Sequence, residues 1–141
     1  MLTSSSLKQI NLSTATHLLK IAQSSSQQEV CGLITCDSNN QQICYPINNI
    51  ASTPNTHFEM DPQQLISTTK LIRELGQSMI AIYHSHPNGC IEPSTHDIQQ
   101  HQYHDLLYII ISPGNDGVLM LGAYWIHPDQ TVEPVELSTQ S

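Results

Sequence analysis

The sequence predicts one α/β domain in which a mixed β-sheet is flanked by helices. Helix-like and strand-like segments alternate along 141 residues, a length that suits a single domain with its own core. The turn-forming sequence at residues 37–40 lies between two apolar segments and indicates a hairpin, which needs antiparallel strands. Helices between other strands allow parallel pairs. We therefore expect residues 1–141 to form one domain, with residues 1–6 and 138–141 as frayed ends.

The composition restricts the possible partners. The chain has 4 Lys and Arg residues against 12 Asp and Glu residues, so its formal net charge is −8. So few cations, scattered along the chain, disfavour binding to nucleic acid. No apolar segment reaches the length of a membrane span, and the first residues lack the pattern of a secretory signal. The four cysteines match no C-x-x-C spacing. We expect a cytoplasmic protein with reduced thiols and no nucleic acid or membrane partner.

The N-terminal part predicts a short strand and then a helix. Apolar and polar residues alternate imperfectly over residues 7–12, which indicates a brief strand. From residue 15 to residue 22, apolar residues recur at i, i+3, i+4 and i+7, the spacing of one helical face. Ser13 stands where an N-cap is expected, and the polar residues 24–28 form a connecting loop.

A hairpin follows this helix. Residues 29–36 predict an apolar strand with the Glu29 carboxylate at its entry, and residues 37–40 form the turn. The returning strand is expected over about residues 42–50, and residues 56–60 predict a further short strand.

The second helix has a clear start and end. Asp61 is the expected cap, Pro62 takes the first helical position, and Gln64 completes the pattern of a capping box. Gly76 ends the helix. The expected buried face consists of Leu65, Ile66, Thr69 and Ile72.

The next segment carries the residues best suited to bind a metal. Residues 79–83 predict a buried strand, and His84 and His86 follow two positions apart, so their side chains share one face if the strand continues. After a loop, Ser94 caps a helix whose first turn contains Asp97. Two imidazoles and a carboxylate leave a fourth position open, as in catalytic zinc sites. A single histidine is usually a surface or core polar residue, but that explanation fits this combined pattern poorly.

The C-terminal part predicts a polar helix and further strands. The helix at residues 94–104 contains one aliphatic residue, so we expect it at the surface with its histidines solvated. Residues 106–112 predict a continuous apolar strand, residues 113–117 a turn, and residues 118–127 the returning strand. The tail at residues 128–141 supplies at most one edge strand.

Two residues have both a structural and a catalytic interpretation. A charge at the entry of a buried strand is costly unless it has a task, and Glu29 could accept a proton from a metal-activated water. Alternatively, Glu29 faces solvent at a strand end. Ser94 could be a plain helix cap that contributes roughly 1 kcal/mol, or its hydroxyl could donate to an oxyanion beside the metal. The pattern of residues leaves both choices open.

These segments together resemble a known motif. Glu29-Val-Cys-Gly-Leu-Ile, then His84-Ser-His-Pro, and then Ser94-x-x-Asp97 resemble the JAMM motif of the MPN-plus metallopeptidases in their compact prokaryotic form. The resemblance covers about residues 7–126 and includes seven residues between the second histidine and the serine. It implies a JAMM/MPN fold of cytidine-deaminase-like architecture. It also implies one Zn²⁺ held by His84, His86 and Asp97, with Glu29 as general base and Ser94 as oxyanion donor.

The resemblance implies a hydrolase. Such an enzyme would be a zinc-dependent peptidase or isopeptidase that cuts after the C-terminal Gly-Gly of a ubiquitin-like sulfur-carrier protein. The alternatives are a deubiquitinase-like isopeptidase acting on other ubiquitin-like conjugates and a non-catalytic MPN scaffold, although scaffold members typically lack these ligands. RadC proteins share a similar segment but carry Asn at the position of Ser85. We expect His57 and Glu59 to border a groove for the substrate tail, and Cys90 to be a loop residue outside the family pattern.

Overall fold

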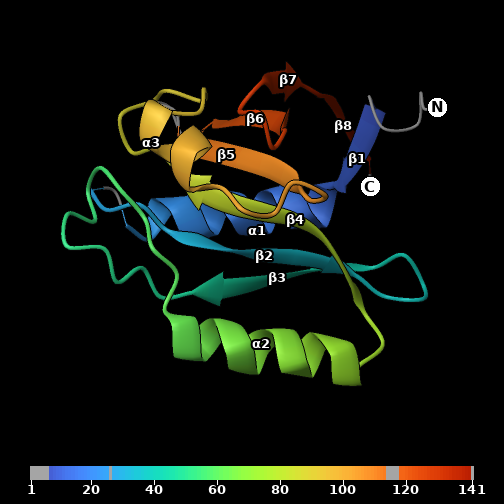
Figure 1. The fold of residues 1–141 in the computed structure, drawn as a ribbon. Coiled ribbons are helices and arrows are strands. Elements are labelled where there is room, and N and C mark those ends of the chain that lie inside the picture. Colours follow the sequence, from blue (N-terminus) through green and yellow to red (C-terminus); the bar gives the residue numbers. More distant parts are fainter. Residues whose placement is uncertain (1–6, 26, 114–117, 141) are drawn as a thin grey trace.

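The central sheet of this computed structural model, which describes residues 7–25, 27–113 and 118–140, contains six strands (Figure 1). They are β2 (Cys31–Cys36), β3 (Gln42–Ile47), β4 (Ser78–Ser85), β5 (Leu107–Pro113), β6 (Leu119–Ile126) and β7 (Val132–Pro134). The strands lie in the order β3-β2-β4-β5-β6-β7, and β4 pairs in parallel with β5. The other neighbouring pairs are antiparallel. This mixed sheet confirms the predicted α/β fold class.

Helices pack on both faces of the sheet (Figure 1). The helices in the described residues are α1 (Leu12–Gln23), α2 (Pro62–Glu74) and α3 (Thr95–Gln100). Leu18 of α1 belongs to the same buried cluster as Tyr83, whereas Ile72 of α2 belongs to a second cluster with Ile82. Successive residues of β4 therefore point to opposite faces, as strand geometry requires. None of these helices is both long and apolar enough to cross a bilayer.

The two ends of the described chain pair with each other. β1 (Leu7–Asn11) and β8 (Glu136–Gln140) form a parallel two-stranded sheet. The tail contains two strands, β7 and β8, so the prediction of at most one strand there is wrong. The second strand forms because β1 gives β8 a partner, which the sequence of the tail does not reveal. β8 includes residues 138–140, which belong to the end that we expected to fray. Residues 1–6, residue 141 and most of the turn predicted at residues 113–117 lie outside the described residues.

The hairpin of β2 and β3 turns at residues 37–40 as predicted, but both strands are shorter than expected. β2 begins at Cys31 and does not include Glu29. The Glu29 N–H donates to the Pro54 carbonyl (2.7 Å) and not to a neighbouring strand. Glu29 therefore lies in the segment before the strand. The returning strand ends at Ile47.

Two other boundaries differ from the prediction. α1 begins directly after β1, so Asn11 and not Ser13 occupies the N-cap position. The Asn11 N–H donates to the side-chain carbonyl of Gln42 (3.0 Å), which holds this junction against β3. Residues 56–60 form one isolated bridge, to Asn49, in place of the predicted strand.

The start and end of α2 follow the prediction in part. Asp61 caps the helix through its side chain, Pro62 takes the first position, and Gly76 at φ +71° follows the last turn. The prediction of a capping box is wrong, because the Gln64 side chain accepts a hydrogen bond from the Asn48 N–H (2.7 Å) and not from the N–H of Asp61. This contact ties the first turn of α2 to the end of β3.

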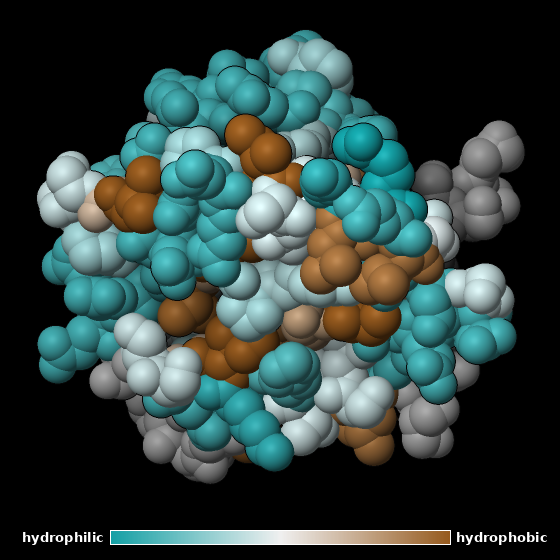
Figure 2. Space-filling model, turned by 90° about the horizontal axis from the view of Figure 1, so that it is seen from below, coloured by the Kyte–Doolittle hydropathy of each residue, from teal (hydrophilic) through white to brown (hydrophobic). Residues whose placement is uncertain are grey.

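The outer side of α2 is more exposed than its periodicity predicts. Ile72 is the residue of α2 that is fully buried, whereas Ile66 is 69% exposed. Figure 2 views the molecule from the α2 side and shows apolar patches between hydrophilic side chains. The helix thus contacts the sheet through a narrow stripe, and the predicted burial of Ile66 is wrong.

We expect Gly32→Ala to destabilise the fold. An added Cβ at Gly32 would collide with the Tyr45 carbonyl and the Tyr83 hydroxyl, at a point where three strands of the sheet meet. Overpacking of this kind costs about 3 kcal/mol. Urea denaturation followed by circular dichroism measures this change. Gly76→Ala is the control, because nothing lies near its added Cβ and only its positive φ costs about 1 kcal/mol. Equal midpoints for the two variants would contradict the packing argument.

Candidate metal centre

The sheet fixes both histidines of the H-x-H pair. His84 lies in β4, between β2 and β5, and is fully buried. His86 follows the strand, and its N–H donates to the Ile111 carbonyl (2.9 Å) while its carbonyl accepts from the Ser112 hydroxyl (2.7 Å). These bonds continue the contact with β5 beyond the end of β4. The two imidazoles therefore lie on one face, as predicted.

The structure brings the three predicted ligands together. The Nε2 atoms of His84 and His86 are 3.0 Å apart. Oδ2 of Asp97 lies 3.3 Å from the first and 3.2 Å from the second. All three side chains are buried, so this triangle of nitrogen and oxygen atoms is shielded from solvent.

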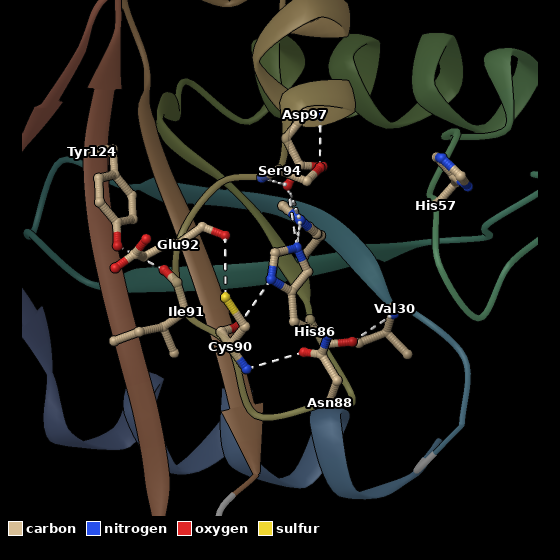
Figure 3. Close-up of polar contacts among 12 residues, drawn as sticks. Val30, His57, His86, Asn88, Cys90, Ile91, Glu92, Ser94, Asp97 and Tyr124 are labelled. Carbon is tan, nitrogen blue, oxygen red and sulfur yellow. Dashed lines mark hydrogen bonds and ion pairs between the residues drawn. The ribbon is translucent and has the colours of Figure 1, made fainter.

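The tautomer of His86 leaves a lone pair facing this triangle. Its Nδ1 lies 2.9 Å from the Cys90 carbonyl, which can only accept a hydrogen bond (Figure 3). Nδ1 therefore carries the hydrogen, and Nε2 of the neutral ring is a free base. The Cys90 carbonyl is itself held, because the Cys90 N–H donates to the Asn88 side chain (3.0 Å) and the Tyr124 hydroxyl donates to the Ile91 carbonyl (2.7 Å). Histidine ligands of metals commonly have such a partner at the second nitrogen.

The donor set and its spacing fit a zinc ion. Ligand atoms about 2.0–2.1 Å from a tetrahedral zinc lie about 3.3–3.4 Å from one another. The three distances between His84, His86 and Asp97, 3.0, 3.2 and 3.3 Å, are close to this value. Hydrogen bonds satisfy the triangle less well, because the hydrogen of the neutral His86 ring lies on Nδ1 and none lies between its Nε2 and Oδ2 of Asp97.

Asp97 is held by the capping box of α3. The Ser94 hydroxyl accepts from the Asp97 N–H (3.0 Å), and Oδ2 of Asp97 accepts from the Ser94 N–H (2.9 Å) (Figure 3). The predicted helix start is therefore present. The helix ends at Gln100, earlier than the predicted residue 104, because the backbone of His101 is already extended.

Burial and charge set the protonation of the three side chains. Complete burial lowers the pKa of His84 and keeps its ring neutral. Burial also acts against a charge on His86, but hydrogen bonding to Asp97 outweighs it and raises the pKa of His86. Burial would raise the pKa of Asp97, yet hydrogen bonds to the two histidines hold that pKa well below its usual range. A cation bound by these three atoms would compete with protonation of His86 at Nε2.

Glu29 lies beside the triangle. Its side chain is only 5% exposed, so the alternative of a solvent-facing glutamate is wrong. Its Oε1 is buried and has no hydrogen-bond partner among the described residues. Ligand atoms of Glu29, His84 and His86 lie within 4.8 Å of one another, a second set that could hold a metal ion. Burial raises the pKa of the Glu29 carboxyl to about 7.

A cavity of about 640 Å³ opens beside Asp97. His57 and Glu59 both line it, so each borders a hollow next to Asp97. Aromatic and aliphatic residues form part of its wall, among them Phe58, Met60, Leu65, Ile82 and Tyr108.

The expectation that the histidines of the third helix are solvated is wrong for His101. It is 8% exposed, packs against Tyr108 with ring centroids 4.8 Å apart, and also lines the cavity. Its buried Nε2 lacks a hydrogen-bond partner within the part of the chain that the structure describes. His96 contacts the ring of His57 (4.2 Å), and His104 lies 2.9 Å from the Ile126 carbonyl through Nδ1. The chain turns inward after the shortened helix, which buries His101.

Three residues that support the site were not predicted from the sequence. Phe58 stacks on His84, with ring centroids 4.4 Å apart and an interplanar angle of 22°. Tyr108 packs edge-on against the same imidazole at 5.3 Å. The Ser85 hydroxyl accepts from the Val30 N–H (2.9 Å), next to Glu29. Only the position of Ser85 between the two histidines could have drawn attention to it, because the other contacts join residues far apart in the sequence.

Comparison with known proteins identifies the family. A family model described as prokaryotic homologs of the JAB domain matches residues 12–126. The chain belongs to this family. The match confirms the resemblance to JAMM/MPN proteins that the motif indicated, and it includes every residue of the candidate metal centre.

Two curated proteins are similar to this JAB-family chain. The desampylase of Haloferax volcanii is 32% identical over 87 residues, which cover 60% of this chain and 63% of the relative. The probable TtuB-protein conjugate cleaving protease of Thermus thermophilus is 38% identical over 73 residues, which cover 52% of this chain and 47% of the relative. The chain thus spans less than two thirds of either relative.

Solved structures share the JAB-family fold. A protein from Desulfitobacterium hafniense superposes with a TM-score of 0.80 at 26% identity, covering 96% of this chain and 93% of that one. A JAB1/MPN domain protein from Archaeoglobus fulgidus gives a TM-score of 0.59 at 19% identity, covering 94% and 99%. The second likeness supports the fold alone.

We expect Ser94→Ala to lower the free energy of unfolding by about 1 kcal/mol, because the N–H of Asp97 loses its cap acceptor. This corresponds to a fall in melting temperature of about 4 °C for a domain of this size. Asp61→Ala, which removes the cap of α2 away from the metal centre, is the matched control and should show a similar loss. A Ser94→Ala variant as stable as the wild type would show that the cap contributes nothing.

Proposed function

We propose that this protein is a zinc-dependent peptidase or isopeptidase that hydrolyses the bond after the C-terminal Gly-Gly of a ubiquitin-like sulfur-carrier protein. The observation that carries this proposal is the convergence of His84, His86 and Asp97 beside the buried Glu29, whose Oε1 has no hydrogen-bond partner among the described residues. The name of the Thermus relative describes a protease that cleaves conjugates, which supports a conjugate as substrate. We expect the enzyme to act in the cytoplasm, where its four free cysteines would stay reduced.

The metal centre would hold one Zn²⁺ through Nε2 of His84, Nε2 of His86 and Oδ2 of Asp97. When bound, zinc would polarise the scissile carbonyl and lower the pKa of its water to about 7. Three protein ligands leave room for that chemistry, whereas a structural site would use a fourth. Glu29 then remains available as a base.

Glu29 would move the proton. Its carboxylate accepts the proton of the attacking water and then delivers it to the departing amine, so that the amine leaves as a neutral group. Burial raises the pKa of this carboxyl to about 7 in the protein without metal. A bound cation nearby would lower that pKa and keep Glu29 ionised.

Ser94 would stabilise the charge that develops on the scissile carbonyl oxygen. Its hydroxyl oxygen already accepts from the Asp97 N–H, so its hydrogen is free to donate. The residue is exposed at the start of α3, where a substrate can reach it. Its capping role and its proposed catalytic role are therefore compatible.

The cavity beside Asp97 would receive the tail of the substrate. Its lining includes the polar side chains of His57 and Glu59 and the apolar side chain of Phe58. Glycine residues next to the scissile bond allow the substrate backbone to approach the buried ligands closely, because they carry no side chain. The residues before them can fill the wider cavity.

Metal analysis tests the centre directly. We expect purified wild-type protein, reconstituted with zinc, to contain about one zinc per chain and His86→Ala to lose it, because the variant lacks one of three ligands. Elemental analysis after dialysis measures the content. His104→Ala is the control, because His104 lies outside the triangle. Wild-type protein without metal after reconstitution would reject the enzyme and favour a non-catalytic scaffold.

The turnover rate of a Glu29 variant tests the proposed role of this residue as the base. We expect Glu29→Gln to keep its zinc and to lower kcat by about 1,000-fold, because an amide cannot accept the proton. The assay follows cleavage of a sulfur-carrier protein extended beyond Gly-Gly by a fluorescent peptide. Glu74→Gln, at an exposed position of α2, is the control. An unchanged kcat in Glu29→Gln would remove Glu29 from this role.

A further inference from the structure

Asn49 uses its whole side-chain amide to join two parts of the molecule. Its Nδ2 donates to the carbonyl of Glu29 (2.9 Å) and to that of His57 (3.0 Å). Its Oδ1 accepts from the N–H of Ala51 (3.0 Å) and from that of Glu59 (2.9 Å). An asparagine amide has two donor hydrogens and two acceptor lone pairs, so its capacity is fully used.

The segment that Asn49 gathers, residues 51–59, touches the metal centre from two sides. Its Pro54 carbonyl accepts from the Glu29 N–H (2.7 Å). Its Phe58 stacks on the imidazole of His84. Through these contacts the 51–59 segment holds the backbone of the proposed base and covers one proposed ligand, while it also forms a wall of the cavity.

Glu29 depends on this segment because it has left the sheet. The last pairing of β2 with β4 joins Cys31 to His84. Beyond it, the Val30 N–H donates to the Ser85 hydroxyl and the Val30 carbonyl accepts from the Ser85 N–H, both at 2.9 Å. Glu29 itself has its N–H bonded to the 51–59 segment and its carbonyl bonded to Asn49. No strand ladder holds its backbone.

We propose that Asn49 is a positioning residue, which fixes the backbone of Glu29 to the 51–59 segment and so sets where the Glu29 carboxylate lies relative to His84 and His86. This inference rests on the proposed role of Glu29 as base. Small displacements of a catalytic group lower the rate strongly, because the reacting atoms must be aligned. The four hydrogen bonds of its side chain go to Glu29, Ala51, His57 and Glu59, and none of them goes to His84, His86 or Asp97.

Kinetics test the consequence for turnover. We expect Asn49→Ala to retain zinc and to lower kcat by about 10-fold to 100-fold, the usual effect of losing a residue that orients a site. Asn49→Asp keeps acceptor oxygens but has no amide hydrogens, so its kcat should fall as well. Asn48→Ala is the matched control, because Asn48 is exposed and bonds its neighbours through its backbone. A zinc-loaded Asn49→Ala enzyme with wild-type kcat would overturn the proposal.

Amide hydrogen exchange tests the clamp without any activity. In the wild type, the amides of Ala51, Glu59 and Glu29 should have large and similar protection factors, because one opening event exposes all three. Asn49→Ala should speed all three by about 10-fold or more, whereas Asn49→Asp should speed mainly Glu29 and leave Ala51 and Glu59 protected.

The outcomes separate this inference from the proposed function. Unchanged exchange at these amides in Asn49→Ala would overturn the clamp. If that variant does not fold, unrelated protection factors of the three amides in the wild type would overturn it equally. Faster exchange in Asn49→Ala, together with a zinc-loaded wild type that cleaves no Gly-Gly substrate, would reject the proposed function and keep the clamp.

Discussion

Three electron-rich atoms held within 3.3 Å of one another in a buried space are the constraint on which this site depends. Two imidazole nitrogens and a carboxylate oxygen repel at that distance unless a cation or a proton lies between them. The fold keeps them together through bonds made elsewhere on each residue. His84 is held by two neighbouring strands, His86 by the Cys90 carbonyl, and Asp97 by the cap of α3. The binding of a metal would relieve this repulsion without moving the backbone.

The parallel pairing of β4 with β5 is what makes the arrangement possible. It places the ends of both strands at one edge of the sheet, where the chain of β4 leaves for the loop and α3. Two residues of β5 contact the histidines: the Tyr108 ring packs against His84, and the Ile111 carbonyl accepts from the His86 N–H. Glu29 enters the same edge from the other neighbour of β4, so residues far apart in the sequence reach one point.

The centre of the site could be predicted from local sequence patterns. Contacts between residues far apart in the sequence could not be predicted in this way. The spacing of His84 and His86 follows from strand geometry, and the relation of Ser94 to Asp97 follows from helix capping. Both involve residues within a few positions of each other. Asn49 contacts His57, 8 residues away, and Glu29, 20 residues away. These contacts depend on the path of a loop, which has no helical or strand periodicity from which to predict it. The pairing of β8 with β1 escaped prediction for the same reason.

The hydrogen bond between His86 and the Cys90 carbonyl has a consequence for how the site tolerates substitution. The main chain supplies the acceptor, so the tautomer of His86 does not depend on which side chain occupies position 90. Asp97, in contrast, is oriented by a serine hydroxyl, and Glu29 by an asparagine amide. The side chain at position 90 can therefore change without removing the acceptor for Nδ1 of His86, whereas Asn88 cannot vary as freely, because its side chain accepts from the Cys90 N–H. The loop thus fixes the imidazole through its main chain at one position and through a side chain at another.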